Sequence, residues 1–275
     1  MDYKTLLLQH LAEYKRSVLN ISEPGVFRFR GRDVPKAHIL PLPMAWQNLP
    51  EPARRLTQAY LHVHPDVKRH KYFHHLNSSQ AFAFSLFFPF FDGGPLASTA
   101  LLRALGLSGT LATWEPEAIP DRKEGTNLDA RWSLADGITV CCEVKLSEGD
   151  FGKAPNDERH RNKLREIYAP RLREHVDPCL LSAPAFFGAY QILRNVWHLV
   201  SLPNSKLVFL LPRANTRLWQ LLLPTLDSVA LATRVHILPV AIEDVLHGLH
   251  NDAKCPNELR EYAKQLERKY VPLAS

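Results

Sequence analysis

Cysteine is scarce in this sequence, and its spacing suits neither a metal site nor a disulfide framework. Four cysteines occur in 275 residues without any C-x-x-C pair: Cys141, Cys142, Cys179 and Cys255. Neighbouring residues of a strand point to opposite faces, so Cys141 and Cys142 are poorly placed to bond to each other. The pattern therefore predicts reduced, packed thiols in a cytoplasmic protein, because disulfides are rare in that compartment.

Long apolar runs are also missing. No stretch approaches the roughly 18 apolar residues that a membrane span requires. The N-terminal segment MDYKTLLLQHLAEYKRS carries charges throughout, so we expect neither a signal peptide nor a transmembrane helix. The histidines between residues 62 and 75 lack a zinc spacing. No helix-turn-helix, zinc finger, internal repeat or low-complexity segment stands out, so the sequence does not indicate how bases would be read.

What is present is an ordinary globular composition with a basic bias. Hydrophobic residues make up 45% and charged residues 23% of the chain, which argues against wholesale disorder. A chain of 275 residues suffices for one large domain or two small ones. The net charge of +6 and the pI of about 9.2 suit a polyanionic partner such as nucleic acid, although many basic proteins bind none.

Hydrophobic patterning predicts helices and strands that alternate along the second half of the chain. Helices are expected at 3–19, 52–63, 76–91, 95–105, 184–200, 214–227 and 257–270. Strands are expected at 110–118, 126–134, 138–145, 206–212 and 234–240. This order is typical of an α/β domain in which helices cover a mixed sheet.

Local signals mark where some of these elements begin and end. Asn77 with Gln80 three residues later resembles a capping box at the start of the Phe-rich helix. Asp136-Gly137 is a tight-turn signal between two strands. Six prolines between residues 21 and 52 predict an irregular N-terminal arm with little helix.

One predicted hairpin carries two acids and a lysine. Its first strand holds Asp129, and its second strand, ITVCCEVK, ends in Glu143 and Lys145. Residues two apart in a strand share a face, so Glu143 and Lys145 project together. Phosphodiester hydrolysis requires a cation at the phosphoryl oxygen, and Mg²⁺ takes one or two carboxylates together with waters. Asp129 and Glu143 therefore predict a Mg²⁺ site, beside which Lys145 could orient the attacking water or neutralise charge on the phosphate.

The spacing of Glu143 and Lys145 means little by itself. Seven acids in the chain precede a lysine by two residues: Asp2, Glu13, Asp66, Asp121, Glu143, Asp252 and Glu267. Only Glu143 ends an apolar strand that follows another strand with an acid. The competing interpretation is a cross-strand ion pair on a solvated sheet edge. Burying an acid in so apolar a run is costly without a cation, which favours the metal site.

These residues carry a resemblance to a known family. Asp129, followed by Glu143-Val144-Lys145 on the next strand, resembles the PD-(D/E)XK nuclease superfamily. The resemblance extends over about residues 70–211 and is closest to a bacterial restriction-endonuclease-like branch of the superfamily. It is carried by four segments: HHLNSSQAFAFSLFFPF, EGTNLDA, CEVKLSEGDFGKA and YQILRN. Leu128 stands where the superfamily name calls for proline.

The resemblance implies a fold and a domain organisation. The core would be a central mixed sheet of four or more strands flanked by helices, built from residues 70–211. Residues 1–69 would form an N-terminal helix and the Pro-rich arm, and residues 212–275 would extend the core. The whole chain, 1–275, would then be a single nuclease-like domain.

The resemblance also implies the chemistry of the site. It places Mg²⁺, or Mn²⁺ in its place, on the carboxylates of Asp129 and Glu143 and on the backbone carbonyl of Val144. Lys145 would be the catalytic lysine. The expected substrate is DNA, hydrolysed by direct attack of water.

The helix expected at 184–200 carries one polar stripe. Gln191, Arg194, Asn195 and His198 are spaced so that all four share a face. The plain interpretation is a face turned to solvent. Related nucleases place a glutamine on the helix after the catalytic lysine, so the resemblance implies a catalytic role for Gln191. It favours phosphate contacts for Arg194 and Asn195.

Other polar residues admit a functional and a structural interpretation. Glu124 is either a support for the metal ligands or a plain loop acid. Ser78 and Gln80 either reach the site from a helix N-terminus or only cap that helix. The segment 151–175, with seven basic and four acidic residues, is either a solvated charged helix or a phosphate-tracking surface. In the second case its contacts would include Lys153, Arg161 and Lys163.

The leading hypothesis is thus a cytoplasmic, bacterial, Mg²⁺-dependent DNA endonuclease that requires no membrane and is compatible with a homodimer. The alternative is a non-catalytic nucleic-acid-binding module of the same fold, which would retain DNA with a steep salt dependence and never cut it. A third hypothesis is a metal-dependent hydrolase of another phosphate ester. The sequence does not decide between DNA and RNA, or between a role in restriction, in repair or in mobile elements.

Overall fold

The computed structural model describes residues 2–272, and the chain divides into two compact units. Unit 1 combines Met1–Ser108 with Ile242–Ser275, whereas unit 2 is the continuous segment Gly109–Ala241. The residues of the predicted 70–211 core are distributed over both units, and the single domain of residues 1–275 stays a prediction. Both acids and the lysine of the hairpin belong to unit 2.

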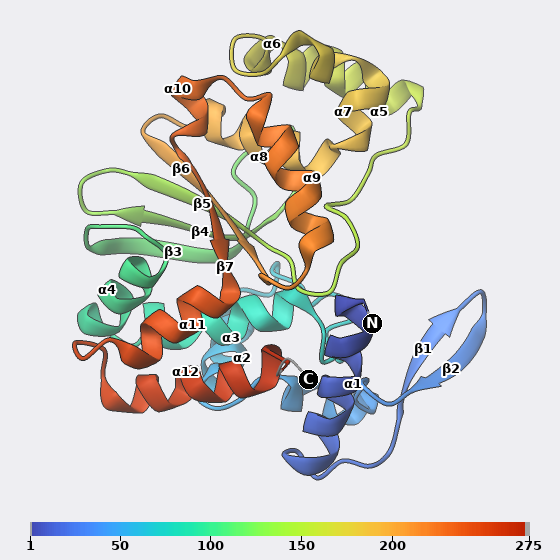
Figure 1. Cartoon of the computed structure of the whole chain (residues 1–275), viewed down its shortest axis with the longest axis vertical. Coiled ribbons are helices and arrows are strands. Elements are labelled where there is room, and N and C mark those ends of the chain that lie inside the picture. Colours follow the sequence, from blue (N-terminus) through green and yellow to red (C-terminus); the bar gives the residue numbers. More distant parts are fainter. Residues whose placement is uncertain (1, 273–275) are drawn as a thin grey trace. The chain divides into compact units, whose positions relative to one another are not determined.

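Unit 2 is built on a five-stranded sheet with the order β3-β4-β5-β6-β7 (Figure 1). The strands are β3 (Leu111–Ala118), β4 (Leu128–Leu134), β5 (Thr139–Val144), β6 (Ser205–Leu211) and β7 (Ile237–Ala241). β3, β4 and β5 are antiparallel, whereas β5, β6 and β7 are parallel. This mixed sheet with flanking helices confirms the predicted α/β class and the sheet of four or more strands.

The hairpin of β4 and β5 forms where the turn signal predicts it. Burial alternates along β4, as expected of a strand with one packed face. Gly137 occupies the turn at φ +85°, a conformation that glycine adopts without strain. β5 is the middle strand of the sheet, and its residues 140–144 are buried. The end of β5 is therefore an interior position, and no solvated sheet edge exists there.

The helices of unit 2 all follow the hairpin in sequence. They are α5 (Glu158–Lys163), α6 (Ala169–Leu172), α7 (Ala183–Gly188), α8 (Tyr190–Ser201), α9 (Thr216–Asp227) and α10 (Leu231–Arg234), with a π-helical turn at Leu164–Tyr168 and a 3₁₀ helix at Pro178–Leu181. α8 contacts β5 and β6, and its Ile192 and Val196 share a core with Phe209. The single helix expected at 184–200 is wrong, because the backbone at Ala189 leaves the helical region and separates α7 from α8.

Unit 1 is mainly helical. Its helices are α1 (Tyr3–Ser17), α2 (Ala53–Val63), α3 (Ser79–Phe91), α4 (Pro95–Ala104), α11 (Ile242–Asn251) and α12 (Asn257–Tyr270). The Phe-rich α3 is buried along nearly its whole length, as its apolar composition predicts. Its cap differs from the expected capping box, because Ser78 rather than Asn77 accepts the hydrogen bond of an N-terminal amide, that of Ala81, at 3.3 Å. α11 has no counterpart among the predicted helices.

The proline-rich segment does not form the irregular arm that the sequence predicts. It contains β1 (Gly25–Phe29) and β2 (Arg32–Lys36), which pair antiparallel as a two-stranded ribbon, and a 3₁₀ helix at Leu42–Asn48. Pro35 lies within β2. A two-stranded ribbon has only edge strands, and an edge strand tolerates a proline that a central strand would not.

The last helix of unit 1 is tied to its N-terminal segment by a buried lysine. Lys269 on α12 is inaccessible to solvent and donates to the Asn48 side-chain oxygen at 2.8 Å. Asn48 in turn donates to the carbonyls of Phe73 and His75 at 2.6 and 2.7 Å.

Within residues 2–272, every helix is too short or too polar to cross a lipid bilayer.

Candidate active site

The register of β4 and β5 brings the two predicted acids together. Ala130 pairs with Cys142, so one further step along the antiparallel register places Asp129 opposite Glu143. The Val144 amide donates to Asp129 Oδ2 at 2.7 Å, which fixes that carboxylate against β5. Opposed side chains of an antiparallel pair lie about 5 Å apart at Cβ. The hairpin thus holds two carboxylates side by side at the end of the middle strand.

Glu143 is buried and surrounded by donors. It is 3% exposed, and Lys145 Nζ lies 2.9 Å from its Oε1. Gln191 Nε2 donates to the same oxygen at 2.7 Å, and Asn195 Nδ2 donates to Oε2 at 3.1 Å. Arg194 approaches Oε2 at 3.6 Å. Each oxygen of Glu143 therefore has a fixed set of partners, which come from α8 and from Lys145 just after β5.

The polar stripe of α8 faces the interior of unit 2, so the solvent-facing interpretation is wrong for three of its four residues. Arg194 is 8%, Asn195 0% and His198 1% exposed. Gln191 is half-buried and touches the loop that follows β5. A Cβ at Gly152 in that loop would lie 3.2 Å from Gln191 Oε1, and Gly152 has φ +83°. Glycine is thus favoured at this position, both by the positive φ and by the close approach to Gln191.

Burial and mutual repulsion set the charges of the pair. Burial raises the pKa of Asp129 well above its ordinary value, and the negative charge of Glu143 raises it further. Burial also opposes ionisation of Glu143, but the positive charges of Lys145 and Arg194 outweigh it and leave the Glu143 pKa lowered. The pKa of Lys145 is raised because Glu143 and other nearby acids outweigh its desolvation. The surroundings therefore favour the ionised form of Glu143 and the neutral form of Asp129.

Glu124 lies in a second buried cluster of unit 2 and is not a plain loop acid. It is 1% exposed and accepts from the Thr126 amide at 2.9 Å and from the Tyr168 hydroxyl at 2.6 Å. The Thr126 hydroxyl also donates to it. His198 Nε2 of α8 lies 3.7 Å away. Glu124 and His198 are among the residues that the sequence singles out, whereas Tyr168 has no spacing signal and could not be predicted.

The remaining predicted residues have other partners or stand in solvent. Gln80 belongs to unit 1, where its Oε1 accepts from the His70 amide at 2.7 Å. Arg161 donates to the Asn156 side chain at 2.7 Å and is accessible. Lys153 is exposed. Lys163 donates to the carbonyl of Glu124 and lies 3.6 Å from its Oε1.

The donor chemistry at Asp129 and Glu143 fits a hard divalent cation. Among residues 2–272, no cluster of three or more His, Cys, Asp or Glu side chains is arranged to hold a metal ion. Mg²⁺ does not require such a cluster, because it keeps several waters and is commonly bound through one or two carboxylates. A cation between Asp129 and Glu143 would relieve the repulsion that raises the Asp129 pKa.

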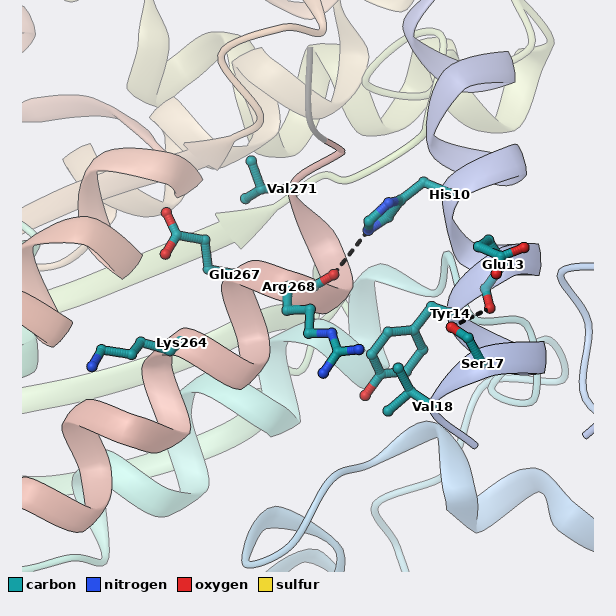
Figure 2. Close-up of a pocket in the computed structure, with 9 residues that line it drawn as sticks. All are labelled: His10, Glu13, Tyr14, Ser17, Val18, Lys264, Glu267, Arg268 and Val271. Carbon is teal, nitrogen blue, oxygen red and sulfur yellow. Dashed lines mark hydrogen bonds between the residues drawn. The ribbon is translucent and has the colours of Figure 1, made fainter. Parts of the chain in front are cut away.

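A separate hollow in unit 1 has a different character. It lies between α1 and α12 (Figure 2), with a volume of about 440 Å³. The residues that line it are His10, Glu13, Tyr14, Ser17, Val18, Lys264, Glu267, Arg268 and Val271. Acids and bases alternate along its walls, and the His10 ring bonds the Arg268 carbonyl at 2.9 Å. Its two acids, Glu13 and Glu267, come from different helices, and the mixture of signs gives no uniform charge for a phosphate.

Comparison with known proteins agrees with the geometry. A model of the protein family described as restriction endonuclease associating with ARP matches residues 8–271. No curated protein and no solved structure matches the chain. The family match spans both units.

Proposed function

The chain belongs to the family of restriction endonucleases associating with ARP, and from this membership we propose that it is a Mg²⁺-dependent nuclease that hydrolyses DNA phosphodiester bonds. Family membership by itself suggests a nuclease-type function. The observation that carries the finer proposal is the pairing of Asp129 with Glu143 beside Lys145 at the buried end of β5. We further propose that the family belongs to the PD-(D/E)XK superfamily, with Leu128 in place of the usual proline.

In this proposal, Asp129, Glu143 and the backbone carbonyl of Val144 hold the metal. Bound Mg²⁺ would polarise the phosphoryl oxygen and lower the pKa of a bound water. The Val144 amide keeps the Asp129 carboxylate directed at the site. Gln191 and Asn195 orient the Glu143 carboxylate through one hydrogen bond to each oxygen.

Lys145 has the position for the remaining role. Its ammonium lies on the same face as Glu143 at 2.9 Å and is partly accessible. Its raised pKa keeps it protonated at neutral pH. A fixed positive charge there stabilises negative charge as it develops on a scissile phosphate, and it orients the attacking water. Asp129, Lys145 and Gln191 are each accessible in part, so they form the side of the site that meets the substrate.

Strand scission tests the proposal. Purified protein is incubated with supercoiled plasmid and linear duplex DNA in Mg²⁺, Mn²⁺ or EDTA, and products are resolved by electrophoresis. We expect cleavage with either metal and none in EDTA. Glu143→Gln and Lys145→Met should abolish it, whereas Asp136→Asn, in the distant turn of the same hairpin, should not. DNA retention without scission in any metal would identify a non-catalytic binding module instead.

A further inference from the structure

The ribbon of β1 and β2 is a regular element with a defined tip. Five residue pairs link its strands, from Gly25 with Lys36 to Phe29 with Arg32. Arg30 and Gly31 form the two-residue connection, with φ +48° and +77°. Positive φ at both positions is the requirement of a type I′ turn, the favoured connection for twisted hairpins. Figure 1 shows the ribbon as two blue arrows that extend away from the helices of unit 1.

The two faces of the ribbon differ in charge. Arg28 and Asp33 are opposed on one face and neutralise each other at 2.8 Å. The other face carries Phe27, Phe29, Arg32, Val34 and Lys36, and among these residues no acid occurs. Residues 25–36 contain four basic side chains and one acid. The excess positive charge therefore lies on the face with the phenylalanines and at the tip.

That face continues onto a neighbouring basic segment of unit 1. Phe27 lies 6.1 Å from Phe29 and 5.7 Å from Tyr72, measured between ring centroids. The Arg30 guanidinium lies over the Phe29 ring, and Lys71 Nζ lies over the Tyr72 ring. We call the ribbon surface the set Phe27, Phe29, Arg30, Arg32, Lys36, Lys71 and Tyr72. It interleaves cations with aromatic rings, as surfaces that bind nucleic acid do.

Folding alone does not explain this surface. Phe29 is 52% exposed, so it does not contribute fully to a core. An isolated two-stranded hairpin is marginally stable in water. Arginine in the left-handed region costs roughly 1–2 kcal/mol, whereas asparagine or glycine would relieve most of it. Arg30 thus places a positive charge at a turn position where asparagine or glycine would give a more stable turn.

We propose that the ribbon surface binds duplex DNA, with β1 and β2 entering the major groove and the basic side chains contacting phosphates. The B-DNA major groove, about 12 Å wide, admits a two-stranded β-ribbon, and a phenylalanine can contact a thymine methyl there. The deep, narrow major groove of A-form RNA does not admit such an element. The inference rests on the proposed function only in taking DNA as the polyanion.

Binding of the full-length protein to fluorescent duplex DNA in EDTA tests this inference without cleavage. The informative variant is Arg30→Asn with Arg32→Thr, because asparagine suits the turn and threonine suits a strand. The matched control is Arg55→Gln with Lys264→Gln, which removes the same charge from exposed positions of unit 1. We expect the ribbon variant to bind about tenfold more weakly, with a slope of log K against log salt smaller by about two.

A neutral variant separates shape from charge. Phe29→Thr should weaken duplex binding and leave the salt slope unchanged, because it removes no phosphate contact. Thermal unfolding checks that both ribbon variants remain folded, and Arg30→Asn should not lower the melting temperature. Equal affinity and slope for the ribbon variant and the matched control would overturn the inference. A loss confined to single-stranded DNA or to RNA would overturn it as well.

The outcome is independent of the nuclease assay. If the wild type binds duplex DNA through the ribbon but never cuts it, the ribbon inference stands and the proposed function falls. If the wild type cuts DNA while the ribbon variant binds DNA like the matched control, the proposed function stands and the ribbon inference falls.

Discussion

Two glutamates of unit 2 are equally buried and face the same helix, yet their surroundings differ. Glu143 and Glu124 are 3% and 1% exposed, and both meet the polar stripe of α8. Glu143 has an acid opposite it and a lysine at 2.9 Å. Glu124 is held by the hydroxyls of Thr126 and Tyr168 and a backbone amide. Burial alone therefore does not distinguish the acid proposed for catalysis from the other one; the kind of neighbour does.

The pKa values express the same difference. Burial raises the pKa of both carboxyls, but hydrogen bonds from Thr126 and Tyr168 leave the Glu124 pKa lowered. At Glu143 the lowering comes from the charges of Lys145 and Arg194. Lys163 lies 3.6 Å from the Glu124 carboxylate and donates to its backbone carbonyl, whereas Lys145 lies 2.9 Å from the Glu143 carboxylate, where its charge can compensate an incoming phosphate. We interpret Glu124 as the acid that holds the loop before β4 and Glu143 as the acid of the reaction.

Activity should separate the two glutamates most strongly. Glu143→Gln is expected to lower single-turnover cleavage by about a thousandfold or more, because it removes a metal ligand. Glu124→Gln should stay within about tenfold of wild type per folded molecule. The measurement is plasmid cleavage with Mg²⁺ at enzyme excess. Comparable losses in both variants would make Glu124 a participant in catalysis and remove the distinction.

Stability should separate them in the opposite order. Glu124→Gln puts an amide group among donors that need an acceptor, which should lower the free energy of unfolding by about 2–3 kcal/mol. Urea titration followed by tryptophan fluorescence measures the change. Glu166→Gln, an exposed substitution in the same unit, should cost less than about 0.5 kcal/mol. An unchanged midpoint for Glu124→Gln would contradict its structural role.

His198 gives the Glu124 cluster a pH signature. Burial lowers the pKa of His198 from 6.5 to about 4, although Glu124 opposes the shift. The unfolded chain therefore takes up a proton below pH 6.5 that the folded chain refuses. Stability from this group is fully present above pH 6.5 and is lost toward pH 4, by up to about 1.4 kcal/mol per pH unit.

His198→Gln should reduce that slope, whereas the exposed His236→Gln should not. Part of the slope should remain in every variant, because burial also lowers the pKa of His38 and His75 in unit 1 to about 4. Urea midpoints between pH 4 and pH 7 supply the comparison. Parallel profiles for His198→Gln and the wild type would show that folding does not change the proton affinity of His198.

The smallest effect is expected at the lysine of the Glu124 cluster. Lys163 lies 3.6 Å from Glu124 Oε1 and is 23% exposed, so Lys163→Met should change stability by less than about 1 kcal/mol. Cleavage should change little. Lys145→Met, which removes the lysine of the other glutamate, should stop cleavage and should also lower stability more than Lys163→Met does, because it leaves the buried Glu143 without its nearest cation. Loss of cleavage in Lys163→Met would instead support the predicted phosphate contact of Lys163.

Much of unit 2 could be predicted because its signals are local. The turn at Asp136-Gly137 and the alternation of β4 define a hairpin, and a hairpin determines its own register. The opposition of Asp129 and Glu143 follows directly. The contacts of Gln191 and Asn195 with Glu143 span 48 and 52 residues. Periodicity predicted the stripe of α8 but could not say which way it faces.

Tertiary context decided what local signals could not. Proline content predicted an irregular arm, because a proline excludes a central strand, but β1 and β2 form an isolated ribbon of edge strands. Asn77 and Ser78 are equally good caps by composition, and the structure uses Ser78. Tyr168 reaches Glu124 across 44 residues, and no spacing rule finds such a partner.

Unit 1 is interrupted in sequence by the whole of unit 2, and this orders events during synthesis. Residues 109–241 leave the ribosome as one continuous segment, so all the partners of Glu143 are available before α12 is made. Unit 1 cannot be completed until α12 has been synthesised, because Lys269 on α12 donates a hydrogen bond to Asn48. The nascent chain should therefore acquire the candidate site first and a complete unit 1 last. Translational arrest just before α12 would separate the two steps in time.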